Sequence, residues 1–535
     1  MPTQRISFEQ ARFLPDRSEN SANMPPEILL EMNDWRIRDG SLNVSHGYYN
    51  PIPPFTTTGP QTLQNRPTFG TNLNFSDDPE ILYFSGPASG DRTFRKVIHG
   101  TNQITDTRQT LSGNAVTFND GDPFEWESFD WGEITVLHNP QYAPIYASSG
   151  SSANDLTNLT NWQTNDRTDY MFPFDTYMVG LGYHGTTPGG SAIDSERVII
   201  TSSRITTFNQ LPTWPLGNVA TSTSAIYPID GLVDGNLIAG GRLQNFAVIY
   251  TDVNALRIED DEGALILTPL FTDSGLLARN SWCQIPNGHF CIGASQIYIH
   301  DGSTKKIIGQ DQWSDTFFSR LVSDRLTEVQ CEYNPRSDTV WIKIPRGSTE
   351  EIWVYNVEGD YIEEIRTNQR CNWMYFTTEG LPFASLTATP PPPFPVDQEE
   401  YEGNRAFRNR MITFGGPDGT TSFFVQELGT DYGGTAIPGS LGREGIVPFD
   451  GYSRTQMMRV VPFYYGTGSV TMRFGGSNEV GTASSNVASK TMTRGTDVKF
   501  DMRFTRRYLS YTLESSSAGL SVAAMDVEFS DKYKR

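Results

Sequence analysis

The histidines and acidic residues are the side chains of this chain that could do acid–base or metal chemistry, but their spacing favours neither. The six histidines are scattered, and only His289 and His300 flank one predicted hairpin, where they would approach each other. The densest acidic run, at a predicted turn, consists of Glu259, Asp260, Asp261 and Glu262. Hydrolysis by paired carboxylates requires two carboxyl groups about 5–9 Å apart across a cleft. Neighbours in one turn are more often solvated, so we expect no catalytic site there, with a calcium site as the alternative.

The four cysteines do not form a zinc-binding pattern. None belongs to a CxxC pair; they are Cys283, Cys291, Cys331 and Cys371. Cys283 and Cys291 flank the tight-turn sequence IPNG and could face each other across a hairpin, but free, buried thiols are the favoured interpretation. The sequence also lacks GxSxG, a Walker lysine loop, a strand-linked GxGxxG and HExxH. We therefore expect no catalytic, cofactor-binding or metal-binding residues, and no enzyme.

Aromatic side chains could serve a different purpose, the stacking of sugar rings. The candidates for a glycan-binding face are Tyr142, Tyr146, Trp341 and Trp353. Alternation places Trp341 and Trp353 on strands, where packing against a neighbouring sheet is the expected role.

A recurring hairpin pattern supplies the elements that would position all these residues. Each instance is an alternating apolar run, a polar or Gly/Pro turn and a second run, which predicts an antiparallel hairpin. The clearest instances are Phe246–Glu259, His289–Asp301, Thr339–Asn356 and Met411–Gln426. Successive starts among the first three are 43 and 50 residues apart, which suits four-stranded propeller blades of roughly 40–50 residues.

The predicted fold class is all-β: a β-propeller-like core of repeated antiparallel hairpins, with an N-terminal segment before it and a β-sandwich-like domain after it. We place the N-terminal segment at 1–77, the core at 78–440 and the C-terminal antiparallel domain at 441–535. In the first, Trp35–Gly40 predicts a strand that ends in an Asp-Gly turn. The best helical pattern is Asp311–Leu321, in which one face carries Trp313, Phe317, Phe318 and Leu321.

A proline-rich insertion near 387–400 interrupts the core. Thr387–Val396 reads TATPPPPFPV and is followed by the acidic Asp397–Tyr401. Such a run cannot join a central sheet and is expected to be extended and stiff. A simple linker and a contact arm to a neighbouring subunit are both open interpretations.

Charge and the N-terminus argue against two further classes of protein. The 535 residues include 62 acidic and 41 basic ones, for a formal net charge of −21, which disfavours a surface that grips nucleic acid by neutralising phosphates. The same charge is compatible with a surface along which nucleic acid passes without adhering. The start, MPTQRISFEQARFLP, lacks the apolar region of a secretory signal, and no stretch approaches the roughly 20 apolar residues of a membrane span. We therefore expect synthesis in a cytoplasm and no membrane span.

Segments from most of the chain, taken in order, resemble the tail nozzle proteins of short-tailed bacteriophages (podoviruses), also called tail accessory or stabilisation proteins. In the N-terminal segment the resemblance lies in DWRIRDGSLNVSHG, which follows a Pro-Pro pair. In the core it lies in IAGGRLQNFAVIYTDVNALRIED, TDSGLLARNSWCQIPNGHFCIGASQIYIHDGSTKKIIGQ and EVQCEYNPRSDTVWIKIP. In the C-terminal domain it lies in GYSRTQMMRVVPFYYGTGSVTMRFGG, GTDVKFDMRFTRRYLSYTLES and SAGLSVAAMDVEFSDKYKR. The departures are Ser41–Asn43 and Ser148–Arg167, which match no part of the family pattern.

The resemblance implies a structural protein of the virion tail, with no catalytic residues. Proteins of this family form a ring, usually of six copies, below the portal and the adaptor. The ring extends and closes the DNA ejection channel and carries fibres or spikes on its outside. For this chain the resemblance implies a homohexameric ring, a tail adaptor protein above it, fibre or spike proteins outside it and viral DNA passing through it without sequence-specific binding. Segment 1–77 would be a platform near the adaptor, and assembly into the virion would occur in the host cytoplasm.

Two alternatives remain open from the residues themselves. A non-viral propeller scaffold predicts a stable monomer with no place in a virion. A β-propeller can also be a host-glycan-binding or glycan-cleaving protein of the tailspike type, for which Asp260 and Asp261 are the candidate carboxylates. The nozzle hypothesis and the glycan hypothesis differ in one observable, since only the glycan hypothesis predicts turnover of a glycan.

Overall fold

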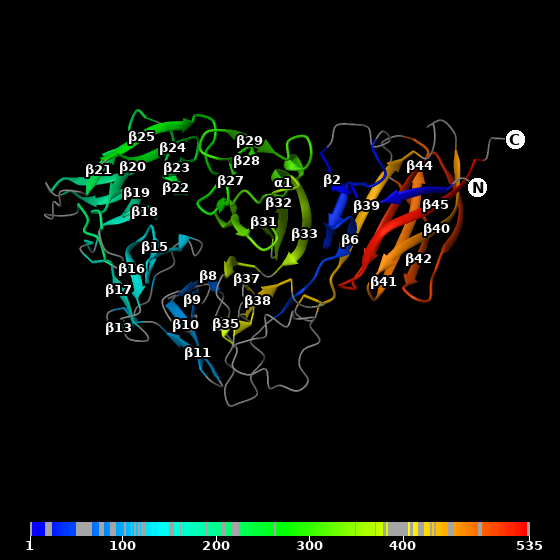
Figure 1. Ribbon diagram of the computed structural model, residues 1–535, viewed down its shortest axis with the longest axis horizontal. Coiled ribbons are helices and arrows are strands. Elements are labelled where there is room, and N and C mark those ends of the chain that lie inside the picture. The colour runs from blue at the N-terminus through cyan, green and yellow to red at the C-terminus, as the bar shows by residue number, and fades with distance from the viewer. Residues whose placement is uncertain are drawn as a thin grey trace.

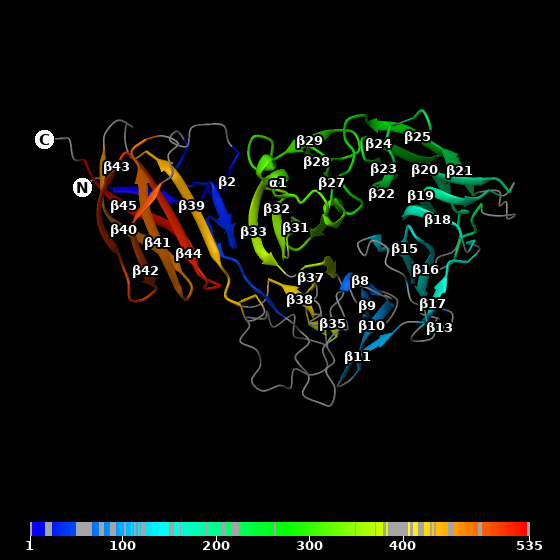
Figure 2. The same cartoon turned by 180° about the vertical axis from the view of Figure 1, so that it is seen from behind.

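The computed structural model is almost entirely β-structure, arranged as a ring of sheets beside a sandwich (Figures 1 and 2). It describes residues 3–16, 24–49, 67–73, 80–85, 93–100, 103–108, 110–111, 114–115, 118, 125–148, 155–160, 162–163, 165–187, 190–205, 210–215, 224–232, 234–261, 264–347, 349–369, 371–377, 381–382, 405–406, 410–415, 422–427, 431–432, 435–447, 454–479 and 484–531. The all-β fold class, with a propeller-like core and a sandwich-like C-terminal domain, is confirmed.

Seven four-stranded antiparallel units, here called blades 1 to 7, form the ring in the described part of the chain (Figure 1). Blade 1 contains β8 (Pro67–Leu73), β9 (Glu80–Ser85), β10 (Thr93–Gly100) and β11 (Gln103–Arg108). Blade 2 contains β14 (Glu127–Trp131), β15 (Ile134–Asn139), β16 (Tyr142–Ser148) and β17 (Asp155–Asn158), and is extended by β12 (Thr110–Leu111) and β13 (Asn114–Ala115). Blade 3 contains β18 (Arg167–Phe174), β19 (Tyr177–Thr186), β20 (Ala192–Thr201) and β21 (Ala225–Pro228). Blade 4 contains β22 (Leu237–Leu243), β23 (Phe246–Thr251), β24 (Ala255–Asp261) and β25 (Ala264–Phe271).

The remaining three blades complete the ring. Blade 5 contains β26 (Trp282–Ile285), β27 (Gly288–Ile292), β28 (Ile297–His300) and β29 (Lys305–Ile308). Blade 6 contains β30 (Gln330–Asn334), β31 (Thr339–Arg346), β32 (Thr349–Asn356) and β33 (Tyr361–Gln369). Blade 7 contains β34 (Trp373–Thr377), β37 (Arg410–Gly415), β38 (Ser422–Gln426) and, from the N-terminal segment, β7 (Tyr48–Tyr49). The short strands β35 (Leu381–Pro382) and β36 (Arg405–Ala406) pair with each other.

The four hairpins predicted from alternation are confirmed as the pairs β23–β24, β27–β28, β31–β32 and β37–β38. Each pair belongs to a different blade, so the sequence pattern marks blades 4 to 7. Central strands of a blade are apolar along their whole length because a neighbouring blade covers each face; all six residues of β23 are buried.

The ring closes between blades 7 and 1 through a side-chain hydrogen bond and a close backbone approach. The Trp373 Nε1–H on β34 donates to the Gly70 carbonyl on β8 at 2.9 Å. A Cβ at Gly70 would lie 2.1 Å from the Phe414 ring, so only glycine allows blade 1 to approach blade 7 this closely. The pairing of β7 with β38 then supplies the outer strand of blade 7 from far away in the sequence.

The C-terminal domain is a sandwich of two antiparallel sheets. One sheet has the order β4 (Glu31–Asn33), β39 (Gly439–Ile446), β44 (Tyr508–Ser515), β41 (Ser469–Ser477) and β42 (Ser485–Thr493). The other contains β45 (Ser521–Asp531), β40 (Thr455–Tyr465) and β43 (Phe500–Arg506), with β1 (Thr3–Ser7) also paired to β45. Alternating apolar residues of both sheets, such as Val460 and Met472, are fully buried between them.

The N-terminal segment joins the sandwich to the propeller in one continuous ten-stranded sheet. β5 (Trp35–Arg38) pairs with β33 of blade 6 through Arg36 and Glu364, and with β6 (Ser41–Val44) across the predicted Asp-Gly turn. β6 in turn pairs with β45 of the sandwich. Figure 1 shows these N-terminal strands in blue between the green blade 6 and the orange and red sandwich. The remaining strands of this segment, β2 (Arg12–Phe13) and β3 (Ile28–Leu29), form a short parallel pair.

The structure departs from the predicted unit boundaries at both ends of the core. Blade 1 begins at residue 67, before the expected boundary at 78, and β39 of the sandwich begins at 439, before 441. The segment expected to be a separate unit at 1–77 instead gives strands to both the sandwich and the propeller. The predicted helix is confirmed as α1 (Ser314–Arg320), with Phe317 buried, followed by the short 3₁₀ turn η3 (Leu326–Glu328). The proline-rich insertion near 387–400 lies outside the described residues.

Candidate functional site: the N-terminal junction and the axial channel

Buried charge concentrates where the N-terminal segment meets blades 6 and 7, a site called here the N-terminal junction. It consists of Asp34, Arg36, Glu363, Glu364, Arg366, Glu427 and Tyr432. Arg36 is 7% exposed, and its neighbours on β5, Trp35 and Ile37, belong to the buried core. The same strand therefore carries apolar anchors and a buried cation.

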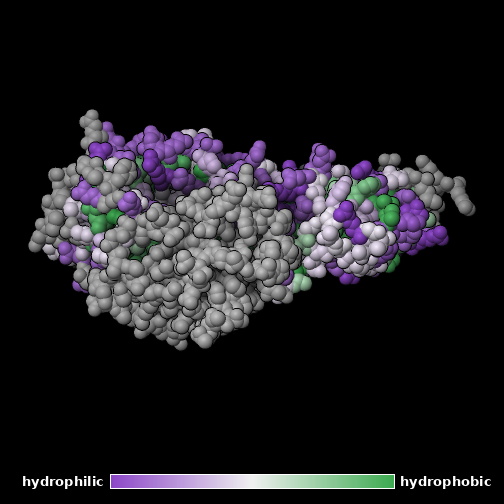
Figure 3. All heavy atoms as spheres, turned by 60° about the horizontal axis from the view of Figure 1, so that its bottom comes forward, coloured by the Kyte–Doolittle hydropathy of each residue, from purple (hydrophilic) through white to green (hydrophobic). Residues whose placement is uncertain are grey.

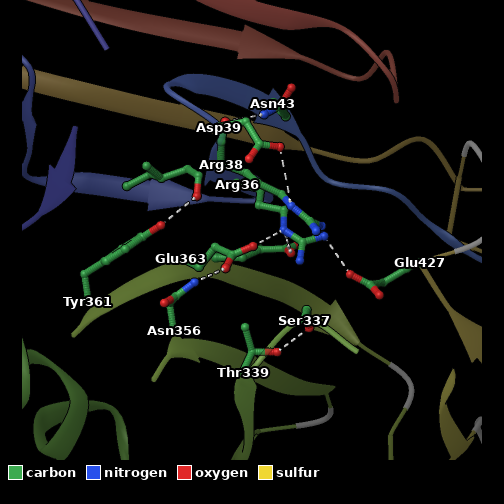
Figure 4. A network of polar contacts seen from close by, with 12 residues as sticks. Arg36, Arg38, Asp39, Asn43, Ser337, Thr339, Asn356, Tyr361, Glu363 and Glu427 are labelled. Carbon is green, nitrogen blue, oxygen red and sulfur yellow. Dashed lines mark hydrogen bonds and ion pairs between the residues drawn. The ribbon is translucent and has the colours of Figure 1, made fainter. Parts of the chain in front are cut away.

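Arg36 is the central residue of the junction. Its guanidinium pairs with the Glu363 carboxylate and, from a second nitrogen, with Glu427 Oε1 at 2.6 Å, while Glu364 Oε2 lies 3.9 Å away (Figure 4). Asn356 steadies Glu363 by donating to its other oxygen at 3.0 Å. Burial by itself lowers the pKa of Arg36, but the three carboxylates outweigh burial and hold that pKa above its usual value. Arg36 thus ties β5 to both β33 of blade 6 and the end of β38 of blade 7.

Arg366 completes the ionic part of the junction without any exposure to solvent. It donates from Nε to Glu364 at 2.7 Å and from another nitrogen to Gln426 at 2.8 Å, and its guanidinium lies 4.9 Å from the Trp341 ring centroid. Burial raises the pKa of Glu427, yet Arg36 and Arg366 overcome this and lower it to about 2. The Glu427 carboxylate therefore stays ionised at neutral pH.

Asp34 anchors the start of β5 in a left-handed backbone conformation, with φ of 55°. It is fully buried, accepts the Thr367 N–H at 2.9 Å and also accepts the hydroxyls of Thr367 and Tyr432. Burial raises the pKa of Asp34, and the hydrogen bonds oppose that rise. Asp34 thereby connects the N-terminal segment to blade 6 and to the chain that leads into the sandwich.

The histidine pair expected on one hairpin does come together, but as a structural link. His289 and His300 are directly paired across β27 and β28, and the Tyr250 hydroxyl of blade 4 lies 2.7 Å from His289 Nδ1 and 2.5 Å from His300 Nε2. The Gly302 N–H donates to His300 Nδ1, and the Arg242 carbonyl accepts from His289 Nε2 at 3.0 Å. Tyr250 therefore accepts from His300 and donates to His289.

Burial keeps both members of this pair neutral. It lowers the pKa of His289 to about 4 and that of His300 to about 3. A neutral pair whose ring nitrogens all have partners is a polar tie between blades 4 and 5. Among the described residues, no group of three or more His, Cys, Asp and Glu side chains is placed to hold a metal ion.

The other predicted site residues are separated or buried. Asp260 lies at the end of β24, where Arg204 donates to it at 3.3 Å, and Asp261 is exposed on the same strand. Trp341 and Trp353 are fully buried, which confirms their packing role; Tyr142 stacks on Trp126. Asp260 and Asp261, the candidate carboxylates of the glycan hypothesis, therefore do not face each other across a cleft in the described part of the chain.

The cysteines are free and buried, as predicted. The hairpin that carries Cys283 and Cys291 is confirmed as β26–β27, but its register pairs Cys283 with Phe290 and Cys291 with Trp282. The two thiols therefore belong to opposite faces of the blade, Cys283 to the core shared with blade 6 and Cys291 to the core shared with blade 4.

The first strands of all seven blades surround an axial channel of about 460 Å³. Its wall includes the aromatic side chains Phe129, Tyr170, Phe172, Trp282, Trp373, Tyr375 and Phe376 and the polar side chains Asn72, Ser128, Asp130, Arg242, Asn280, Gln284, Glu127 and Glu332. Glycine makes room for the rings, since a Cβ at Gly241 would lie 2.2 Å from Trp282 and one at Gly240 would lie 2.8 Å from Phe172. Aromatic rings thus make up a large part of the channel wall.

Two carboxyl groups in the channel wall have raised pKa values. Glu127 on β14 pairs with Arg279 Nε at 3.1 Å, although Arg279 precedes β26 on the opposite side of the ring. Burial raises the pKa of Glu127 well above its usual range, against the effect of Arg279. Burial also raises the pKa of Glu332 on β30 to about 7, while the Phe376 N–H donates to its carboxylate at 3.2 Å. Ionisable groups with such shifts in a cavity are a recognised mark of functional sites.

The two sites differ in how visible they are in the sequence. The junction has a signal, because charged residues interrupt apolar strands at inward positions in WRIR and YIEEIR. The channel has none, because Glu127, Arg279 and Glu332 come from separate blades that only ring closure brings together.

Comparison with known proteins finds only distant structural likenesses. No protein-family model and no curated protein matches the chain. The solved structures it resembles include the WD40 domain of coronin from Toxoplasma gondii, with 8% identity over 71% of this chain and 84% of that chain and a TM-score of 0.35. A second is apo AztD from Citrobacter koseri, with 10% identity over 65% of this chain and 86% of that chain and a TM-score of 0.29. A third is an exo-β-1,3-galactanase from Phanerochaete chrysosporium, with 9% identity over 90% of this chain and 100% of that chain and a TM-score of 0.24. Likenesses this distant carry no argument about fold or activity, and the propeller-like fold rests on the sheet topology of the chain itself.

Proposed function

We propose that the chain is a non-enzymatic structural protein of a phage virion, the subunit of a ring-shaped tail nozzle or hub. The observation that carries the proposal is the fusion of propeller and sandwich into one continuous sheet through the N-terminal segment. A DNA-conducting ring must keep its shape under the pressure of packaged DNA. Sheet continuity reinforced by buried ion pairs resists relative motion of the two domains, which is the property such a part needs.

The size of the axial channel determines where DNA would pass. At about 460 Å³, with aromatic rings on its wall, the channel has the volume of a small-molecule pocket and cannot admit a duplex. In this proposal the DNA path is therefore formed between copies, as head-to-tail closure of a ring produces. The net charge of −21 on each copy favours a lumen along which DNA slides with little adhesion.

The sandwich offers surface for contacts between copies or with an adaptor. The strands β42 and β43 are the last strands of their respective sheets. Three exposed apolar side chains lie at this end of the sandwich: Val487 on β42, Val498 just before β43 and Tyr465 at the end of β40, with 45%, 76% and 58% exposure. Figure 3 shows green apolar patches among pale and purple atoms at the sandwich end of the molecule. We propose a homohexameric ring, with the adaptor and the fibres or spikes docking on its surface. Among the described residues no helix has the length and hydropathy to cross a membrane.

The copy number of the chain in purified particles tests this proposal. Quantitative mass spectrometry, with the portal protein as the internal reference, should return about six copies per virion. A count well above six in multiples of three indicates spikes or fibres instead. Absence from the particle contradicts every virion role.

A second candidate is the glycan-binding or glycan-cleaving propeller, and one observation favours it. The axial channel combines aromatic walls with two carboxyl groups, Glu127 and Glu332, whose pKa values burial raises. If the chain cleaves glycans there, reducing ends should accumulate with the wild-type protein and not with Glu127→Gln or Glu332→Gln. The nozzle proposal predicts no turnover with any of the three proteins.

A further inference from the structure

Charge is distributed unevenly between the two domains of the chain. Residues 439–535, which contain most strands of the sandwich, have 13 basic and 9 acidic side chains and a formal net charge of +4. Residues 1–438 have 28 basic and 53 acidic side chains and a formal net charge of −25. Opposite charges on two parts of the same chain favour contact between those parts when two copies meet.

The outer strand of blade 4, β25, has a long and uncharged free edge. In the described part of the chain it pairs with β24 only, and its eight residues, ALILTPLF, include no charged side chain. The outer strands of the neighbouring blades, β21 and β29, have four residues each, and two of those in β29 are lysines. Proteins usually keep free edges short, charged or interrupted by proline, because such edges pair readily with another chain. In β25 only Pro269 has this effect, near the C-terminal end, which leaves residues 264–268 open to a further strand.

The sandwich has a second free edge, in β42. Among the described strands β42 pairs with β41 only, and Lys490 is the single charged residue among its nine. Val487 is exposed on this strand. The adjacent β43 is the last strand of the other sheet and exposes Arg503 at the same edge of the sandwich. This edge is therefore open to pairing and has positive charge beside it.

The charges beside the two edges are opposite in sign. The acidic run 259–262 precedes β25, and residues 255–271 have one basic and four acidic side chains, a formal net charge of −3. Residues 485–506, which include β42 and β43, have five basic and two acidic side chains, a formal net charge of +3. Blade 5 is a poorer partner for this basic edge, because Lys305 and Lys306 lie on its outer strand. Edge length and charge therefore both favour β25.

We propose that copies of the chain associate head to tail, with β42 of one copy added to the free edge of β25 on blade 4 of the next. Figures 1 and 2 show β25 and the sandwich at opposite ends of the molecule, so the two edges of one chain do not meet each other. Two different surfaces at opposite ends form a heterologous contact, which generates a ring when the rotation between copies closes. Main-chain hydrogen bonds supply the affinity, and the flanking charges orient the partners. This inference rests on the proposed ring of copies and names the surfaces that join them.

Crosslinking with a short bismaleimide tests the contact in the full-length chain, because the four native cysteines are buried. Ile266 on β25 and Val487 on β42 are exposed at 43% and 45%. The double variant Ile266→Cys/Val487→Cys should give a ladder of crosslinked multimers. Either single variant should stay uncrosslinked, because in a head-to-tail contact neither residue meets its own counterpart. Ile307→Cys/Val487→Cys is the matched control and should give no ladder, since Ile307 has the same 43% exposure but lies on β29 of blade 5.

Self-association of the wild-type chain should also depend on salt. In sedimentation experiments the dissociation constant should rise at least about tenfold between about 50 mM and about 500 mM sodium chloride, and Arg503→Glu should raise it at least about fivefold at the lower salt. Crosslinks in a single variant would indicate a two-fold dimer and overturn the proposal. It is also overturned by an equal ladder with the control, by no ladder at all, or by association that neither salt nor Arg503→Glu weakens. None of these results contradicts the nozzle proposal, which the copy number in particles decides separately.

Discussion

At the scale of single residues, buried charge does most to define this molecule. Arg36 and Arg366 lie inside the fold, and each has at least two hydrogen-bonding partners from carboxylates or amides. A buried ion pair contributes little net stability compared with apolar residues of the same size, but loss of one partner leaves an uncompensated charge in a low-dielectric interior. The junction therefore specifies how the segment docks more than it adds to the total stability.

Replacing Arg36 should expose this dependence. Arg36→Gln leaves Glu363 and Glu427 without their cation and should lower the free energy of unfolding by about 3–5 kcal/mol in urea titrations. Arg473→Gln, in a solvent-exposed cross-strand pair with Glu514, is the control and should leave the unfolding midpoint almost unchanged. Equal midpoints for the two variants would show that the junction charges are not stabilising.

Acid should weaken the junction through Glu427. Its pKa falls from 4.5 to about 2 on folding, so the folded state favours the carboxylate. The resulting stabilisation is fully present above about pH 4.5 and is lost as the pH falls towards 2. In urea titrations between pH 7 and pH 3, the stability difference between the wild type and Glu427→Gln should shrink as the pH falls. A difference that stays constant over this range contradicts the assignment.

At the scale of elements, the closing strand β7 depends on a single tight approach. Gly47 precedes β7, and a Cβ there would lie 1.8 Å from the Asp431 carbonyl oxygen, a backbone atom that cannot rotate away. Gly47→Ala should therefore displace β7 from β38, lower the unfolding midpoint and speed proteolysis within blade 7. Gly442→Ala is the control, because its Cβ would meet its nearest atom at 3.5 Å, an ordinary contact. Identical proteolysis of the two variants would show that β7 does not close the ring.

The same elements show how far sequence patterns predict this fold. Hairpins such as β23–β24 are predictable because alternation and turn residues are local, and the Asp39-Gly40 turn has the positive φ values that its sequence favours. Pairing of β7 with β38, or of β5 with β33, joins residues more than 300 positions apart, and no local pattern encodes such a partner. The channel carboxyl groups escaped prediction for the same reason, whereas the buried charges in YIEEIR left a readable signal.

At the scale of the whole molecule, the continuous sheet predicts that propeller and sandwich unfold together. No tryptophan follows Trp373 in the sequence, so tryptophan fluorescence reports on the propeller and the N-terminal segment. Hydrogen exchange of peptides from β44 reports on the sandwich. The two signals should change at the same urea concentration, because β5 and β6 belong to both domains. Two separate transitions would mean that the domains are linked only loosely.

The most direct test of the proposed function is a three-dimensional reconstruction of the phage tail by electron cryo-microscopy. Six copies of the chain should form a ring below the adaptor, with the DNA path between the copies and each axial channel away from that path. A chain found in trimeric spikes on the outside of the tail, or a duplex that runs along the propeller axis, would contradict the account.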